Sequence, residues 1–205
     1  MLILYPTKPM TNKTKMIRGS LCMLMFCLLL NPLKGQEVKI LEGSKPGSFN
    51  VRSNMLGWLF LVPNLGVEYR AADRIGLLAD GGLSHWNFKR NGNDHYWRNW
   101  YAAPQLRYYT NDSRDAYIGL KGTVGDYNIS NEQGRFMGGG FTFGKQYSAG
   151  KKLMIDIGLT LGFLQFSKVE KMRHVNGEHY RTATIPDRTY WGPTGISISF
   201  SRRTN

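Results

Sequence analysis

The sequence contains only two cysteines among its 205 residues, Cys22 and Cys27, and both lie near its beginning. The chain that follows them can form no disulfide and offers no thiolate for catalysis. Glycine-rich phosphate loops and dinucleotide fingerprints are also lacking. The run Gly138, Gly139 and Gly140 lies in an apolar, strand-like stretch, where glycine permits tight curvature. We therefore expect no cofactor.

Long hydrophobic runs are absent as well. The apolar run Leu21–Leu30 is far shorter than the roughly 20 residues that a spanning helix needs. A basic region that ends at Arg18 precedes it, and a small, polar exit follows over residues 31–36. This order predicts a cleaved secretory signal peptide over residues 1–35, with a membrane anchor as the alternative. Met10 and Met16 are alternative starts to Met1.

Acidic residues are absent before Gln36, where five of the 27 basic residues lie. The sequence pI near 9.9 first suggests a nucleic-acid partner. The remaining basic residues, however, are scattered along the chain and not clustered on one helix. We therefore expect no nucleic acid among the partners.

The chain does contain apolar residues that alternate with small or polar ones. In Leu153–Phe166 the odd positions are apolar, and the even positions include Asp156, Thr160 and two glycines. A strand with one apolar face of this length is typical of a tilted strand that crosses a bilayer in about 9 to 11 residues. Its other face suits the crowded interior of a small barrel.

Eight segments share this pattern, although the faces of the first cannot be assigned. They predict an all-β fold, an eight-stranded antiparallel up-and-down transmembrane β-barrel over residues 49–200. Residues 36–48 would form a periplasmic lead-in and residues 201–205 a C-terminal tail. A soluble, lipocalin-like barrel is the alternative, but it would need a polar exterior. The expected strands are Phe49–Trp58, Asn64–Arg70, Ile75–His85, Tyr96–Tyr109, Ala116–Val124, Phe136–Lys145, Leu153–Phe166 and Thr189–Phe200.

The connectors alternate in length, as they do in outer-membrane barrels with short periplasmic turns and longer outer loops. Three are short, and three are polar loops over residues 87–95, 126–135 and 167–188; the first outer connector, residues 57–63, is an exception. Pro104 lies inside a strand and implies a bulge or a local break in pairing. Four tryptophans fall near expected strand ends, where aromatic girdles lie: Trp58, Trp86, Trp97 and Trp191.

The end of the chain, Thr194–Phe200, resembles a pattern that outer-membrane assembly machinery reads in a last strand. With PNLGVEY at residues 63–69, PQLRYY at 104–109 and WGPTGISISF at 191–200, the chain resembles a family of small OmpA/OmpX-like outer-membrane barrels of Gram-negative bacteria, classified as a domain of unknown function. Gln105 stands where the family pattern has an acid, and Lys145 where it has an aromatic residue. The resemblance implies the barrel fold and the bacterial outer membrane, with outer-membrane lipid, glycolipid and the barrel assembly machinery as partners. Its weaker implication is an accessory role beside surface fimbriae and their proteins.

The inward positions carry charges of both signs in a lumen barely wide enough for side chains. Buried charges persist when they are paired and hydrogen-bonded. We interpret them as a lumen charge network that closes the barrel, with a gate or proton path as the alternative. The network comprises Glu68, Arg70, Asp80, Arg107, Lys121 and Asp156.

Catalytic and metal sites are weakly indicated. An outer-membrane enzyme that acts on lipid A, a hydrolase or an acyltransferase, is the alternative function, and Ser84–His85 is the one suggestive pair. Adjacent strand residues point to opposite faces, so we expect no enzyme. His174, Glu178 and His179 lack a metal-ligand spacing, and we expect no metal.

The largest expected outer loop is Ser167–Arg188, which is modestly cationic. Barrels carry specificity on loops that a rigid scaffold holds, so this loop is the expected place for contacts with phosphate or sugar at the cell surface. A solvated loop without a ligand is the equal alternative. The candidate contact residues are Lys168, Lys171, Arg173, Tyr180 and Arg181.

Overall fold

The structure, a computed structural model, describes residues 45–90, 93–150, 152–175 and 178–204. The expected signal peptide lies outside these residues, as does most of the lead-in. Nine strands and one short helix make up the elements. Their bounds are β1 Phe49–Asn54, α2 Met55–Leu59, β2 Asn64–Ala72, β3 Ile75–Arg90, β4 Asn93–Tyr109, β5 Ala116–Ile129, β6 Glu132–Ser148, β7 Leu153–Val175, β8 Glu178–Ile185 and β9 Arg188–Arg203.

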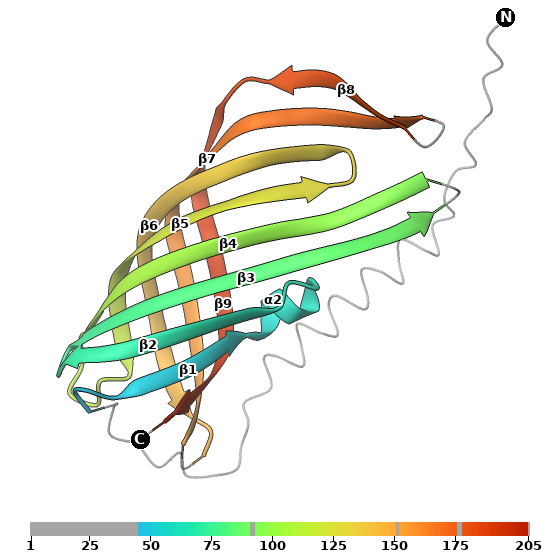
Figure 1. The fold of residues 1–205 in the computed structure, drawn as a ribbon. Coiled ribbons are helices and arrows are strands. Elements are labelled where there is room, and N and C mark those ends of the chain that lie inside the picture. Colours follow the sequence, from blue (N-terminus) through green and yellow to red (C-terminus); the bar gives the residue numbers. More distant parts are fainter. Residues whose placement is uncertain (1–44, 91–92, 151, 176–177, 205) are drawn as a thin grey trace, which may run out of the picture. The chain divides into compact units, whose positions relative to one another are not determined.

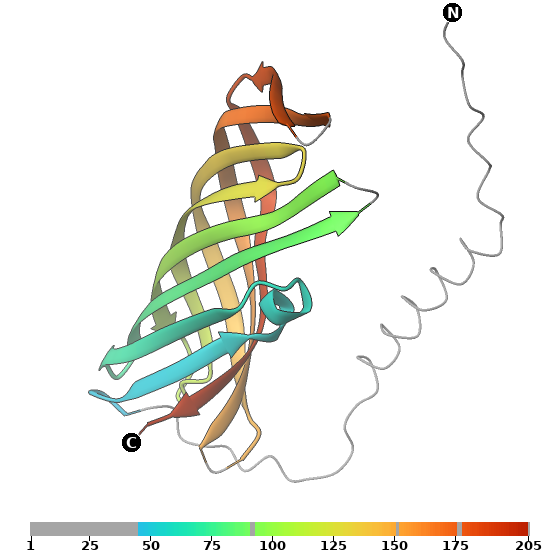
Figure 2. The same ribbon diagram turned by 45° about the vertical axis from the view of Figure 1, so that its right-hand side comes forward.

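The strands form one antiparallel sheet that closes on itself. Each strand from β1 to β7 pairs with the next, β7 also pairs with β9, and β9 pairs with β1. The ring therefore has eight strands, and β8 pairs with the upper part of β7 as a ninth. In Figures 1 and 2 the strands wind around a common interior, with β7 and β9 behind β1 to β4 in Figure 1. The predicted antiparallel all-β fold is confirmed.

The two ends of the ring differ in their connections. At one end, here called the short-turn end, the connections lie at residues 73–74, 110–115 and 149–152. At the other, the hairpin end, strand pairs run beyond the ring (Figure 1), and the described residues 130–131 join β5 to β6. The prediction that these segments form outer loops is thus wrong, because residues 87–90, 126–129 and 132–135 lie in strands. Polar side chains lie on both faces of these extensions, and such a sequence pattern also predicts a loop.

The segment Ser167–Arg188 departs furthest from its prediction. It forms the end of β7, all of β8 and the start of β9, and Val169 pairs with Ile185 at the base of the β7–β8 hairpin. Strand β7 changes partner here, since its residues up to Phe166 pair with β9. Lys168, between the two pairings, has a φ of 51°. The left-handed backbone at Lys168 lets β7 pair with β9 before this residue and with β8 after it.

The first strand is also shorter than predicted. Strand β1 ends at Asn54, whose side-chain Oδ1 accepts a hydrogen bond from Leu56 N and so caps helix α2. Asn64 holds the connection in place, because its Nδ2 donates to the carbonyl oxygen of Asn54 at 2.9 Å. With the strand ended at Asn54, its faces become clear: Asn50 and Arg52 are buried, and Phe49 and Val51 are exposed.

The two faces of the sheet have opposite chemistry. In β2, Asn64, Glu68 and Arg70 are buried, while Leu65 and Val67 between them are exposed. The same alternation continues around the ring. Among the described residues, buried side chains are mostly polar or charged and large hydrophobic side chains are mostly exposed. The inside is polar and the outside apolar, the reverse of a water-soluble domain.

Pro104 interrupts the sheet on one side only. Its partner on β3 is Ala79, and that ladder is continuous. Toward β5 the pairs run to Ala102 and resume at Gln105 without a change of register. The predicted local break is therefore confirmed, and it is not a bulge.

Candidate functional site

A cluster of buried charged and polar side chains crosses the interior toward the short-turn end; we call it the lumen plug. Asp156 of β7, fully buried, is its centre. Its Oδ2 accepts from Arg107 Nη1 at 2.7 Å and from Arg52 Nη1 at 3.2 Å, and its Oδ1 accepts from the Tyr117 hydroxyl at 2.9 Å. Gln146 Nε2 donates to Oδ2 as well, at 3.1 Å. One carboxylate thus ties together strands β1, β4, β5, β6 and β7.

Glu68 of β2 forms the second half of the plug. Its Oε2 accepts from Arg107 Nη1 at 3.1 Å, and its Oε1 accepts a short hydrogen bond from the Tyr109 hydroxyl. Arg52 Nη2 extends the network to Ser199 Oγ of β9 at 2.7 Å. Each of these side chains is less than 4% exposed, so the ion pairs lie away from water. Salt bridges in such places persist when their remaining donors and acceptors are satisfied. Here Arg52 Nε and Arg107 Nε are the plug donors without a hydrogen-bond partner among the described residues.

Seven of the eight ring strands contribute a side chain to the plug. The eighth, β3, has a glycine at this level, and its missing side chain leaves room for the plug. Strand β3 places Gly76 beside Glu68, where an added Cβ would lie 2.6 Å from Glu68 Oε1 and 3.2 Å from the Tyr109 ring. The glycine is therefore required by close approach and not by its backbone angles. The plug residues are Arg52, Glu68, Arg107, Tyr109, Tyr117, Gln146, Asp156 and Ser199.

The predicted lumen charge network falls into three groups. Glu68, Arg107 and Asp156 meet in the plug. Arg70 is fully buried beside it, and its guanidinium stacks on the Tyr109 ring at 3.4 Å. Asp80 and Lys121 lie nearer the hairpin end, where Asp80 accepts from the Tyr101 hydroxyl at 2.9 Å.

Arg52, Tyr109, Tyr117, Gln146 and Ser199 are missing from the predicted set. The expected strand Phe49–Trp58 is four residues longer than β1, and the added apolar residues hide the alternation that marks Arg52 as inward-facing. The tyrosines, the glutamine and the serine have inward positions in the sequence pattern. Their participation could have been inferred from the alternation, although they carry no charge.

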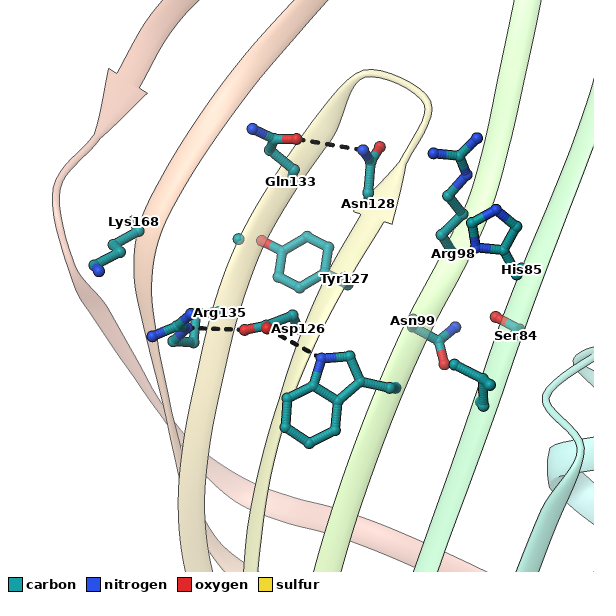
Figure 3. A pocket seen from close by; sticks show the side chains of 13 residues that line it. Ser84, His85, Arg98, Asn99, Asp126, Tyr127, Asn128, Gln133, Arg135 and Lys168 are labelled. Carbon is teal, nitrogen blue, oxygen red and sulfur yellow. Dashed lines mark hydrogen bonds and ion pairs between the residues drawn. The ribbon is translucent and has the colours of Figure 1, made fainter.

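A second polar site lies on the strand extensions, in a cavity of about 370 Å³ shown in Figure 3. Asp126 occupies it, accepting from Trp100 Nε1 at 3.0 Å and from Arg135 Nε at 2.9 Å. Asn128 donates to Gln133 Oε1 at 3.3 Å on the neighbouring strand. The cavity also contains Arg98 and Lys168, so with Arg135 its cationic side chains outnumber its one carboxylate.

The Ser84–His85 pair lines this cavity, but the structure does not bring the two side chains together. The Ser84 side chain is buried and its hydroxyl donates to the carbonyl oxygen of Trp97 at 3.3 Å, while His85 is exposed. Among the described residues, no hydrogen bond joins Ser84 to His85, and Asp126 bonds to Trp100 and Arg135. A nucleophile, a base and an orienting acid within hydrogen-bond reach are what such catalysis requires.

The predicted surface-contact residues lie on the β7–β8 hairpin and not on a loop. Lys168, Lys171, Arg173 and Arg181 are exposed, and Tyr180 is 51% exposed. Arg181 is engaged, because its Nη1 lies 2.6 Å from Glu170 Oε1. Hydrogen bonds from Arg181 and Gln133 hold the pKa of Glu170 below its usual range.

Among the described residues, no cluster of three or more His, Cys, Asp or Glu side chains that could hold a metal ion occurs. The side chains of His174, Glu178 and His179 lie outside the described ones. In the described part of the chain, no helix has the length and apolar character needed to cross a membrane.

Comparison with known protein families gives a match over most of the chain. A family model described as protein of unknown function (DUF3575) matches residues 21–201. The chain belongs to this family. No curated protein and no solved structure matches the chain.

Proposed function

We propose that this DUF3575 protein is an eight-stranded β-barrel of the bacterial outer membrane, exported by a cleaved signal peptide. The observation that carries the proposal is the reversed polarity of the closed sheet. Leu65, Leu83, Phe141, Leu120 and Ile196 are each more than half exposed and come from five different strands. A continuous apolar exterior of this kind marks a surface that meets lipid or protein, and a closed sheet leaves no unpaired backbone group to face lipid.

Aromatic side chains at the two ends of this exterior support a bilayer as its environment. Toward the hairpin end, Trp58, Trp100 and Trp191 are exposed by 56, 41 and 73%. Toward the short-turn end, Tyr108 and Tyr147 are exposed by 48 and 45%. Tyrosine and tryptophan gather at both membrane–water interfaces, and the apolar band of such barrels lies between two aromatic girdles.

The lumen plug supports a barrel that does not conduct. Asp156 and Arg107 bridge the interior, and an eight-stranded barrel is just wide enough for side chains to fill. An ion on this path would have to displace pairs that are buried and hydrogen-bonded, at a cost of several kcal/mol for each ion left without its partner.

The role that this arrangement supports best is structural or surface-interacting. The hairpin end would face outward, since longer connections of outer-membrane barrels are extracellular. Exposed Lys168, Lys171 and Arg173 on the β7–β8 hairpin would then meet phosphorylated glycolipid of the outer leaflet or a surface protein through charge-assisted hydrogen bonds. An accessory role beside surface fimbriae falls within this proposal.

Cell fractionation with heat-modifiable migration tests the proposal. The folded protein should be recovered with outer membranes, and it should migrate faster in a detergent gel before boiling than after. Recovery in the soluble periplasmic fraction would overturn it. Purified protein in planar bilayers should give no regular conductance steps, and reproducible steps would overturn the closed lumen alone.

A replacement on the β7–β8 hairpin tests the surface role separately. Exchanging Met172–Ala183 for the two residues Asn-Gly joins Lys171 to Thr184, which lie near each other across the hairpin. All pairs between β7 and β9 are retained, so assembly and heat-modifiable migration should be unchanged. Binding to lipopolysaccharide-containing vesicles should fall, because the replacement removes Arg173, Tyr180 and Arg181 and keeps Lys168 and Lys171. Unchanged binding would place the contact elsewhere.

A further inference from the structure

The interior of the ring contains a cavity of about 550 Å³ on the hairpin side of the lumen plug. Arg52, which also belongs to the plug, lines the end of the cavity nearest the plug. Leu56 of α2 and Phe60, which directly follows α2, line the opposite end. The cavity therefore ends blindly at the plug and is narrowed by α2. Its volume lies in the range of roughly 300 to 1,000 Å³ typical of small-molecule sites.

Two buried nitrogen donors in this cavity have no hydrogen-bond partner among the described residues. Gln105 is 7% exposed, and its Nε2 makes no hydrogen bond; the same holds for Arg52 Nε. No hydrogen bond or ion pair joins Lys121 to a described residue either. Buried donors without partners cost about 1 to 3 kcal/mol each, so a native structure normally satisfies them with water or a ligand.

Gln105 and Lys121 are placed to act on one ligand. They are paired residues on β4 and β5 and both face inward. The Lys121 ammonium reaches across the interior, because a Cβ added to Gly195 of β9 would lie 3.7 Å from Nζ. Strands β5 and β9 are not neighbours in the ring, so the side chain spans the cavity.

The charge balance of the interior favours an anion. Two cations, Arg52 and Lys121, stand against one carboxylate, that of Asp80, in the lining of the cavity. The carboxylates of Glu68 and Asp156 are occupied by the plug. A surplus positive charge in a low-dielectric interior is stabilised by a bound anion far more than it would be in water.

The remaining lining is rich in hydroxyl groups and includes one carboxylate. Asp80 accepts from Tyr101, and its remaining lone pairs are available to accept from a ligand hydroxyl. Such groups match an anion that itself carries hydroxyl groups. The hydroxyl residues of the cavity are Tyr101, Thr123, Thr142, Thr160, Thr194 and Ser197.

We propose that this cavity binds a small hydroxylated anion, of the size of one sugar ring with a carboxylate or phosphate, held by Lys121 and Gln105. The anionic group would accept from the Lys121 ammonium and Gln105 Nε2, and the ring hydroxyls would donate to Asp80 and exchange hydrogen bonds with the threonines. This function is independent of the hairpin contacts proposed above. It requires only the closed ring and the plug beneath the cavity.

Isothermal titration calorimetry on the full chain folded in detergent tests the proposal with three probes: glucuronate, glucose 6-phosphate and neutral glucose. Saturable binding of at least one anionic probe, and weaker binding of glucose, is expected. The preferred anion identifies carboxylate or phosphate as the group recognised. Equal binding of glucose, or no saturable heat with either anion, would overturn the proposal.

Variants locate the site. Lys121→Met keeps the length of the side chain and should weaken anion binding roughly tenfold to a hundredfold, the range expected for a lost charge-assisted hydrogen bond. Gln105→Leu should weaken it by less, and Lys152→Met, an exposed lysine at the short-turn end, should leave it unchanged. Heat-modifiable migration shows that each variant is folded. Equal losses in Lys121→Met and Lys152→Met would mean a nonspecific charge effect and would overturn the assignment.

Discussion

The short-turn end and the hairpin end of the ring use the same residue types in different ways. At the short-turn end, Asp156 is fully buried and shared by two arginines from different strands. At the hairpin end, Arg181 and Glu170 form a single pair in which Arg181 is 62% exposed. Exposed pairs contribute about 0 to 1 kcal/mol, whereas removing one partner of a buried pair costs about 3 to 5 kcal/mol.

The difference teaches where stability and adaptability lie in this fold. The plug connects nearly every strand of the ring, so changes there should affect the whole sheet. The strand extensions pair with few neighbours, and β8 pairs with β7 alone in the described chain. Changes there should remain local, which makes this end suitable for contacts that vary.

The largest expected effect comes from Asp156→Ala. It would leave Arg52 and Arg107 without the carboxylate that both contact, and it should lower the free energy of unfolding by roughly 3 to 5 kcal/mol. Urea titration of the protein folded in detergent measures it. The matched control is Asp112→Ala, whose exposed partner is Arg74 and which should cost less than about 1 kcal/mol. Equal effects at the two sites would mean that the plug does not hold the ring together.

A smaller destabilisation is expected when all plug side chains are kept but a methyl group is added next to them. Gly76→Ala would place a methyl group 2.6 Å from Glu68 Oε1 and should destabilise by about 1 to 3 kcal/mol, as overpacking does. Gly122→Ala is the control, since its nearest neighbour, Pro104 Cγ, lies at an ordinary 3.7 Å. The same urea titration compares them. A destabilisation by Gly122→Ala as large as that by Gly76→Ala would contradict the space requirement.

The ring was predictable from sequence, and the plug only in part. Alternation in Leu153–Phe166 and Asn64–Arg70 identifies both the strands and their inward faces, because successive strand residues point to opposite sides. Glu68, Arg107 and Asp156 follow from it directly. Arg52 did not, because apolar residues of α2 continued the apparent strand beyond Asn54, where only the capping contact to Leu56 marks the end.

The hairpin end was not predictable for a different reason. Its strands carry polar residues on both faces, as in the adjacent residues Glu132 and Gln133 of β6, so no apolar face distinguishes them from loops. These segments are strands because they continue the backbone pairing that the same strands already make within the ring. The partner switch of β7 depends on the positive φ of Lys168, a residue type that gives no signal for such a conformation.

That partner switch predicts a local effect of Lys168→Val. A β-branched residue is strained at φ 51°, so the β7–β8 hairpin should open more readily by about 1 to 2 kcal/mol, while Lys168→Gly should leave its opening unchanged or reduce it. Native-state hydrogen exchange of the β8 amides measures this opening. Lys171→Val on the same strand has no such strain and serves as the control. Faster exchange throughout the ring would show that the hairpin is not a separate unit.

The smallest expected effect is the pH dependence of the Glu170 contact, which lies outside the ring. Its pKa is lowered by hydrogen bonds from Arg181 and Gln133, so the contact stabilises the hairpin fully above the ordinary glutamate value of about 4.3 and is lost as pH falls through the lowered pKa. Exchange of the β8 amides, corrected for intrinsic rates, should therefore be constant from neutral pH to about pH 5 and increase only in stronger acid. Glu170→Gln should exchange somewhat faster than the native protein at neutral pH, and the two should converge in acid, because both then lack the carboxylate charge. A difference that persists unchanged below the lowered pKa would show that the hairpin depends on the shape of the Glu170 side chain and not on its charge.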